Sequence, residues 1–255
     1  MSGKPASAPF LRRLNLRLLL IDPFYPPPPE KMRDPKRKAP RPLNKVSIEG
    51  FMAALQSANP EPKGELNFES TYQLLVAVVL SAQATDVSVN AATAHLFADA
   101  PTPEAMVALG EEEIRAHIRT IGLFNTKAKN VLALSKILLE QHGGQVPGDM
   151  DALVALPGVG RKTANVVLNI AFGQPVIAVD THIFRLGNRT GLAPGATPEA
   201  VEQGLMRRLP TPFLRHAHHW LILHGRYVCT ARKPLCEVCV ARGFCGYPDK
   251  GAKPD

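Results

Sequence analysis

The feature that most constrains the fold is a group of four cysteines near the end of the 255-residue chain, which has no others. Cys229, Cys236, Cys239 and Cys245 follow the spacing C-x6-C-x2-C-x5-C within 17 residues. Thiolates packed this closely can enclose structural zinc, and one C-x2-C pair with two longer arms suits a cubane [4Fe–4S] cluster as well or better. Two disulfides are the remaining alternative. The crowding excludes a secreted scaffold stapled by disulfides along its length.

Composition and charge narrow the class of protein. Hydrophobic residues make up 45% of the chain and charged residues 20%, as in ordinary soluble globular domains, and the length allows one large domain or two small ones. No apolar run approaches the roughly 18 residues of a membrane span. Residues 1–45 hold 11 basic and 3 acidic residues, residues 46–155 hold 6 and 13, and residues 156–255 hold 13 and 6. The basic second half of the folded body favours a polyanionic partner.

Residues 1–42 form a basic, proline-rich extension that we expect to be disordered or loosely attached. Residues 26–29 are four consecutive prolines, and residues 33–41 mix Lys, Arg and Pro, a composition with too little apolar surface to fold alone. Three interpretations remain open: a basic arm attracted to DNA phosphates, a transit peptide, or a solvated extension that includes an overlong start assignment. Residues 251–255 form a short tail.

The rest of the chain consists of successive helix signals without a strand or hairpin pattern, which predicts an all-α fold. Residues 72–82 are apolar on nearly every side, as in a buried central helix. A Gly-Gly pair at residues 143–144 ends a periodic segment. In chain order, we expect helices over residues 72–82, 103–110, 111–120, 127–142, 150–156, 161–172, about 180–190, 198–209 and 212–224.

Residues 156–164, with the sequence LPGVGRKTA, predict a helix-hairpin-helix: a short helix, a tight turn with two glycines, and a second helix. Gly158 and Gly160 allow the backbone to approach a phosphate closely. The N–H groups of Val159, of the second glycine and of the next helical turn would point outward at an anion, a contact that positions DNA without reading its sequence. The alternative is an ordinary turn between helices, but Arg161 and a lysine follow directly in a basic half of the chain.

Lys162 and Asp180 are the candidate catalytic residues. Lys162 falls in the first turn of the helix after the hairpin, where the helix dipole and partial burial would favour the neutral amine, a nucleophile that can form a Schiff base. Simple contact with phosphate is the alternative. Asp180 follows the apolar run at residues 176–179. It could cap the next helix, or it could stabilise positive charge on a sugar and move protons in the same pocket as Lys162, and the two roles are compatible.

Four further residues and a histidine group give weaker signals. Gln83 ends the buried helix and Leu123 lies in a short loop, so taken alone they indicate a helix-end amide and a loop hydrophobe. Arg232 and Lys233 lie between the first two cysteines, where a metal centre would hold them on a short basic loop for phosphate contact or leave them solvated. We interpret three histidines on one predicted helix as structural or surface residues: His216, His218 and His219.

Several motifs together resemble the endonuclease III family of helix-hairpin-helix DNA glycosylases. The matching segments are LPGVGRKTAN from Leu156, VDTHIFR from Val179, LSAQATD from Leu80, HHWLILHGRY from His218, and the four-cysteine spacing. The resemblance runs from about residue 45 to residue 248, and residues 1–42 have no clear counterpart in the family.

The resemblance implies two helical lobes that flank a DNA-binding cleft. Residues 64–173 would form a six-helix barrel with the helix-hairpin-helix, and residues 43–63 and 174–250 would form an iron–sulfur cluster lobe. The four cysteines would hold a [4Fe–4S] cluster with a structural role. The partner would be double-stranded DNA with an oxidised pyrimidine or an abasic site, with no membrane and no small-molecule substrate. The protein would be a monomer in the bacterial cytoplasm, or in an organelle or nucleus if the extension is a targeting segment.

The resemblance also implies a bifunctional DNA glycosylase and AP lyase of base excision repair. The enzyme would flip an oxidised pyrimidine such as thymine glycol out of the duplex. Lys162 would attack C1′ of the sugar, expel the base and form a Schiff base that permits β-elimination, while Asp180 would assist base loss and lysine deprotonation. Gln83 and Leu123 would fill the gap and wedge the stack. The remaining DNA contacts would come from Gly158, Val159, Gly160, Arg161, His182, Arg232 and Lys233.

Two other functions remain as alternatives. A mismatch-type adenine glycosylase shares the hairpin and the cluster, but it lacks the nucleophilic lysine and carries a further C-terminal domain, whereas this chain has Lys162 and ends ten residues after Cys245. A non-catalytic helix-hairpin-helix DNA-binding module would be nearly unchanged when Lys162 is replaced, whereas an enzyme would lose strand cleavage.

Overall fold

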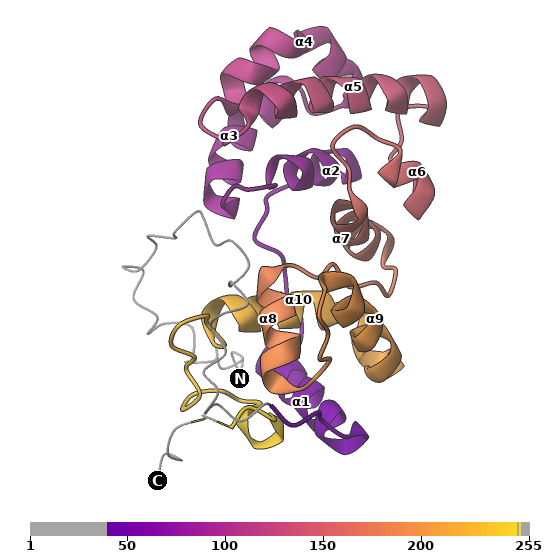
Figure 1. Ribbon diagram of the computed structural model, residues 1–255. Helices are drawn as coiled ribbons and strands as arrows, with labels where there is room; N and C mark the ends of the chain where they lie inside the picture. The colour runs from indigo at the N-terminus through magenta and orange to yellow at the C-terminus, as the bar shows by residue number, and fades with distance from the viewer. Residues whose placement is uncertain (1–39, 249, 251–255) are drawn as a thin grey trace, which may run out of the picture. The chain divides into compact units, whose positions relative to one another are not determined.

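The computed structural model describes residues 40–248 and residue 250, and within these residues it contains ten α-helices, one 3₁₀ helix and no strand (Figure 1). The prediction of an all-α fold is therefore confirmed. The predictions made for residues 1–39 and 251–255 lie outside the described residues. None of the helices in the described part is long and apolar enough to cross a membrane.

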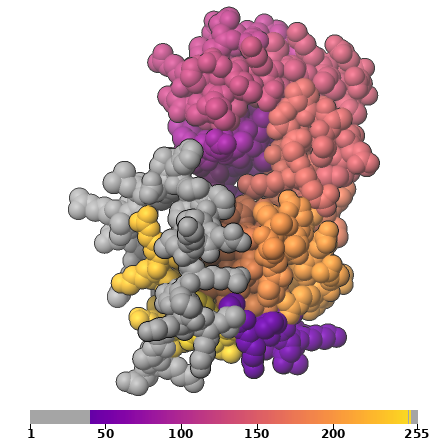
Figure 2. Space-filling view, in the orientation of Figure 1, coloured from indigo at the N-terminus to yellow at the C-terminus, as the bar shows by residue number. Residues whose placement is uncertain are grey.

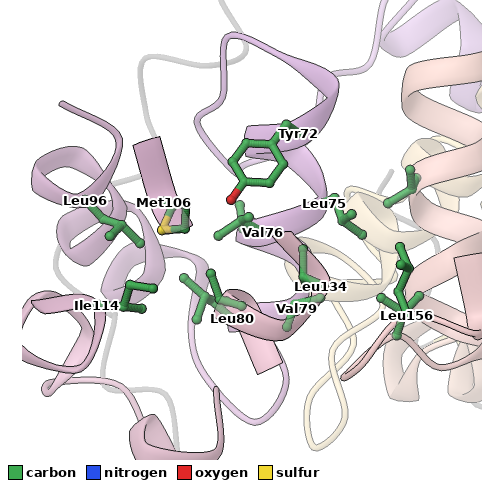
Figure 3. Close-up of a cluster of buried hydrophobic side chains, with 14 of the residues drawn as sticks. Tyr72, Leu75, Val76, Val79, Leu80, Leu96, Met106, Ile114, Leu134 and Leu156 are labelled. Atoms are coloured by element: carbon green, nitrogen blue, oxygen red, sulfur yellow. The ribbon is translucent and has the colours of Figure 1, made fainter. Parts of the chain in front are cut away.

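Six consecutive helices surround the first of two hydrophobic cores. Nine of the ten residues of α2 (Thr71–Leu80) are buried, which confirms the predicted central helix. Leu80, Met106 and Ile114 gather with the residues around them in this core (Figure 3). The other helices around it are α3 (Asp86–Asp99), α4 (Pro103–Ile118), α5 (Phe124–His142), α6 (Met150–Val154) and α7 (Arg161–Phe172).

The second core joins the segment before the first core to the segment after it. The indole N–H of Trp220 donates to the carbonyl of Asn59 at 2.7 Å, which ties α10 to the end of α1. The predicted lobe boundaries, 43–63 with 174–250 and 64–173, stay a prediction. The elements of the second core are α1 (Lys45–Ala58), α8 (Thr181–Thr190), α9 (Pro198–Arg208) and α10 (Thr211–Tyr227). The 3₁₀ helix η3 (Arg242–Phe244) lies against α1, where the ring of Phe244 packs on Gly50.

Two helices and one kink differ from the simplest interpretation of the sequence. Helices α1 and α3 were not expected, and each begins at a side-chain cap: Asn44 accepts from the N–H of Ser47 at 2.8 Å, and Thr85 accepts from the N–H of Ser88 at 3.2 Å. The two helices expected over residues 103–110 and 111–120 are the two halves of α4, which meet at a kink where Gly110 has a φ of 82°.

The end of the expected extension is held by the second core. The N–H of Arg41 donates to the carbonyl of Gly246 at 3.2 Å, and that of Leu43 donates to the carbonyl of Gly191 at 2.9 Å. A Cβ atom on Gly191 would lie 2.1 Å from the Arg41 carbonyl oxygen, and its φ is 78°, so only glycine fits this close approach.

Candidate active site

The hairpin between α6 and α7 needs its two glycines for different reasons. Gly158 has a φ of 79°, and a Cβ atom there would lie 2.9 Å from the side-chain nitrogen of Asn130. Gly160, the N-terminal cap of α7, has a φ of −91°, and a Cβ atom on it would meet nothing within 4 Å. The fold therefore requires glycine at Gly158, while the open space at Gly160 suits the close approach of another molecule.

The N-terminus of α7 is a suitable place for an anion. No side chain caps the helix at Gly160, and the first N–H groups of a helix have no acceptor within it. The N–H of Val159, which we expected to point outward at an anion, instead donates to the carbonyl of Leu156 at 3.1 Å. The Val159 side chain is buried in the first core, so this residue anchors the hairpin.

Arg161 forms an ion pair on the surface between α7 and α9. Its Nη2 lies 2.9 Å from Oε1 of Glu202. Figure 2 shows that the salmon and orange parts of the chain adjoin at the surface. The Arg161 side chain is 60% exposed. A pair this open stabilises the fold by at most about 1 kcal/mol, so the guanidinium can exchange Glu202 for a phosphate.

Lys162 is the second residue of α7 and is exposed, so the partial burial predicted for it is not found. The charge of Lys162 acts on His218 of α10, which is 4% exposed. Burial above all, and then the charges of His219 and Lys162, lower the pKa of His218 to about 3. His218 also hydrogen-bonds the backbone of Ala178. The buried imidazole of His218 thus lies against the segment that leads into Asp180 and senses the charge of Lys162.

Asp180 caps α8, which confirms one of the two roles considered for it. Its Oδ1 accepts from the N–H of Ile183 at 2.8 Å. His182, in the first turn of the same helix, is half-buried, and burial lowers its pKa although the charge of Asp180 acts in the opposite direction. The Nδ1 atom of His182 lies 3.3 Å from Nη2 of Arg185. The start of α8 is thus held by its own side chains.

Gln83 and Leu123 lie on two neighbouring loops. Each holds a left-handed backbone, and no other residue except glycine does so in the part of the chain that the structure describes. A Cβ atom on Gly122 would lie 3.7 Å from the Gln83 carbonyl oxygen, so the loops touch. The Leu123 side chain is 59% exposed. Such backbone conformations tend to persist at functional sites.

The four cysteine thiols lie near one another and form no disulfide. Burial above all, together with the charges of the other thiols, raises the pKa of Cys239 to about 11, although a hydrogen bond from the backbone of Ala241 acts in the opposite direction. The sulfur of Cys229 lies 3.6 Å from Nη1 of Arg189, and that of Cys245 accepts from the N–H of Tyr247 at 3.4 Å. Among residues 40–248 and 250, no group of three or more His, Cys, Asp or Glu side chains is arranged to hold a single metal ion.

Helix α8 holds the base of the loop between the first two cysteines. Arg189 donates to the carbonyls of Thr230 at 2.6 Å and Ala231 at 2.7 Å. Arg185 donates to the carbonyl of Cys229 at 3.2 Å. The exposed residues Arg232 and Lys233 therefore stand on a fixed base. The sequence analysis missed both supporting arginines, because basic residues on a helix are usually solvated.

The comparisons with known proteins identify the family. Residues 76–211 match the family model described as "HhH-GPD superfamily base excision DNA repair protein". The chain is 57% identical over 208 residues to Endonuclease III of Escherichia coli (strain K12), which covers 82% of this chain and 99% of the relative. The chain belongs to the endonuclease III family. Endonuclease III of Rickettsia conorii is 59% identical over 189 residues, which cover 74% of this chain and 90% of the relative.

Solved endonuclease III structures share the fold. A trapped endonuclease III–DNA covalent intermediate has a TM-score of 0.74 and 42% sequence identity, and covers 80% of this chain and 96% of that chain. A non-covalent endonuclease III–DNA complex has the same TM-score and identity, and covers 80% and 95%. As a member of the endonuclease III family, the protein is a DNA glycosylase and AP lyase of base excision repair, which confirms the predicted activity.

Proposed function

We propose that this protein removes oxidised pyrimidines such as thymine glycol from double-stranded DNA, with Lys162 as the nucleophile and Asp180 as its helper. The observation that carries the proposal is the place of Lys162: an exposed amine in the first turn of α7, two positions after the uncapped Gly160. A phosphate bound at the helix N-terminus would hold the DNA backbone beside this amine. The solved covalent endonuclease III–DNA intermediate supports a covalent step in a relative.

The reaction divides between the two residues. The neutral Lys162 amine forms a bond to C1′ while the glycosidic bond breaks and the damaged base leaves with the bonding electrons. The departing base takes up a proton from water, and opening of the sugar gives a Schiff base. Transfer of a C2′ proton to water breaks the C3′–O bond and releases the 3′ phosphate, and hydrolysis of the Schiff base restores the lysine. The Asp180 carboxylate stabilises the positive charge that develops on the sugar and takes a proton from the lysine.

Gln83 and Leu123 occupy the space that the flipped nucleotide leaves. Extruding a nucleotide breaks its stacking and pairing, which is unfavourable by a few kcal/mol unless protein groups replace those contacts. An amide can pair with the estranged base, and an exposed leucine can insert between bases. The contact between their loops through Gly122 supports a joint role for the two side chains.

DNA phosphates would contact the hairpin and the cysteine loop. Gly158 shapes the hairpin, Val159 anchors it, and Gly160 and Arg161 offer an N–H group and a guanidinium. Arg232 and Lys233 would contact a second stretch of backbone. His182, half-buried beside Asp180, would contact DNA only with the ring edge that remains accessible. All of these contacts are independent of base sequence.

A [4Fe–4S] cluster suits the four cysteines. Cys229, Cys236, Cys239 and Cys245 would hold it, and the cluster, when bound, supplies cross-links between the segments that carry them. Thiolate ligands need nearby donors and positive charge. Arg189 near Cys229 and the N–H of Tyr247 near Cys245 meet this need. The proposed role is structural: to hold the basic loop that carries Arg232 and Lys233.

The test compares wild type, Lys162→Gln and the control Lys129→Gln on a duplex with one thymine glycol. We expect wild type and the control to release the base and leave a nick 3′ to the lesion. Lys162→Gln should bind the duplex and do neither. A Lys162→Gln protein that still nicks the strand would overturn the assignment of the nucleophile. The monomeric state, the bacterial cytoplasm and the alternative organelle or nucleus stay predictions.

A further inference from the structure

Two consecutive residues near the end of α10 hold two different parts of the proposed site. Gly225 lies against the start of α8: a Cβ atom on it would be 3.0 Å from the Cβ of His182 and 3.1 Å from the His182 carbonyl oxygen. Arg185 donates to the carbonyl of Gly225 at 2.6 Å. The end of α10 therefore fixes the turn of α8 that Asp180 caps.

Arg226, the next residue, reaches the other core. Its guanidinium forms ion pairs with Asp86 and with Glu65, and the neighbouring Tyr227 hydroxyl donates to Glu65. The side chains of Arg226 and Asp86 are 26% and 17% exposed. Asp86 is the first residue of α3 and lies three positions after Gln83. The end of α10 therefore also fixes the turn that carries Gln83.

These contacts differ from an ordinary surface ion pair because they are partly buried and involve more than two residues. Glu65 is bound on a second side, because its carbonyl accepts from the side chain of Asn90 on α3 at 2.8 Å. A half-buried pair loses hydration when it forms, so it contributes little net stability and is better suited to fixing one arrangement among several. The arrangement that these ion pairs would fix is the position of the Gln83 turn, beside the first core, relative to the Asp180 cap, beside the second core.

We propose that Arg226 is a positioning residue that sets the Gln83 turn and the Asp180 cap in register. It would not contact the substrate. It ensures that the amide that fills the gap and the carboxylate that assists Lys162 act on the same nucleotide. Misplacement of a reacting group by about 1 Å can lower a rate about a hundredfold. Loss of the Arg226 ion pairs, which lie near both Gln83 and Asp180, should therefore slow the chemical step. The inference rests on the roles proposed above for Lys162, Asp180 and Gln83.

The experiment measures single-turnover formation of the borohydride-trapped adduct on a thymine glycol duplex, at saturating enzyme and per active molecule. We expect Arg226→Gln and Asp86→Asn each to lower this rate at least about tenfold, while the Kd for the duplex changes less than threefold. Arg226→Lys, which keeps the charge, should recover much of the loss. The double variant should be no slower than the slower single variant, because the two residues act as one unit.

Arg115→Gln is the matched control, because Arg115 forms ion pairs with Glu111 and Glu112 inside α4 and, among residues 40–248 and 250, with no other element. Its rate should stay within twofold of wild type. If Arg226→Gln and Asp86→Asn lower only the Tm and leave the rate per active molecule unchanged, the pair is merely structural and the inference is wrong. Additive losses in the double variant would also overturn it. An absence of adduct with wild type would instead overturn the proposed function itself, and the inference with it.

Discussion

Gln83 and Leu123 hold left-handed backbones with φ values of 55° and 61°, and Gly122, directly before Leu123, lies against the carbonyl of Gln83. Neither residue type favours this conformation, which is unfavourable by roughly 1–2 kcal/mol for a residue with a Cβ atom. Two such residues on touching loops indicate that the fold maintains both side chains in position for a purpose other than stability.

Substitution of Leu123 by Asn should separate stability from activity. Asn tolerates a left-handed backbone, and the leucine side chain is 59% exposed, so little burial is lost. We expect the free energy of unfolding to stay level or to rise, and lesion removal from duplex DNA to fall about tenfold, or about 1.4 kcal/mol. Denaturant unfolding and a nicking assay measure the two quantities. Lesion removal at the wild-type rate would show that the side chain is not a wedge.

The two hairpin glycines should respond to alanine in opposite ways. Gly158→Ala places a Cβ atom 2.9 Å from Asn130 at a φ of 79°, so we expect a loss of roughly 1–2 kcal/mol of stability. Gly160→Ala meets no protein atom within 4 Å, so its stability should be unchanged. Its Cβ atom would instead obstruct a phosphate, and we expect the Kd for duplex DNA to rise about tenfold. Unchanged DNA affinity in a folded Gly160→Ala protein would contradict the proposed phosphate site.

Acid should destabilise the protein through His218. Its pKa is lowered from 6.5 to about 3 by burial and by the nearby charges of His219, Lys162 and Arg226. The unfolded chain therefore binds a proton below pH 6.5 that the folded protein does not bind until about pH 3. The stability that this neutral imidazole provides is complete above pH 6.5 and falls by about 1.4 kcal/mol per pH unit on acidification within that window.

Unfolding free energies measured between pH 4 and pH 7 test this prediction. His218→Gln should show a shallower slope than wild type. The exposed His95→Gln is the matched control, with the wild-type slope. An identical slope in His218→Gln would show that His218 does not stay neutral in the folded protein.

The cofactor proposal predicts a coloured protein. Iron–sulfur charge transfer absorbs at about 410 nm, whereas zinc is colourless. We expect the purified protein to be yellow-brown with four iron atoms per chain, and Cys239→Ser to lose the band and the duplex affinity that depends on Arg232 and Lys233. A colourless, folded protein with stoichiometric zinc would contradict the cluster.

Local signals predicted most of the fold. The apolar composition of residues 72–82 predicted the central helix α2, and the glycine turn that ends at Gly160 predicted the start of α7. Helix α3 was not predicted, because its Ala, Ser, Thr and Asn residues give little apolar periodicity. The sequence motif located Lys162 but not its exposure, because burial depends on segments far along the chain.

The long-range contacts of the site could not be predicted from spacing. Arg226 and Asp86 are 140 positions apart, and each alone is an ordinary charged residue near a helix end. The left-handed conformations of Gln83 and Leu123 also have no local signature, because neither residue type favours this conformation. His218, interpreted as a structural or surface residue, is buried between elements that only the tertiary fold brings together.

The central claim is that Lys162 forms the covalent bond to DNA, and borohydride trapping tests it most directly. Wild type and Lys162→Ala are incubated with a duplex that bears one thymine glycol, and the Schiff base is reduced to a stable adduct. The account predicts an adduct with wild type and none with Lys162→Ala, although both bind the duplex. An adduct of equal yield with Lys162→Ala would contradict it.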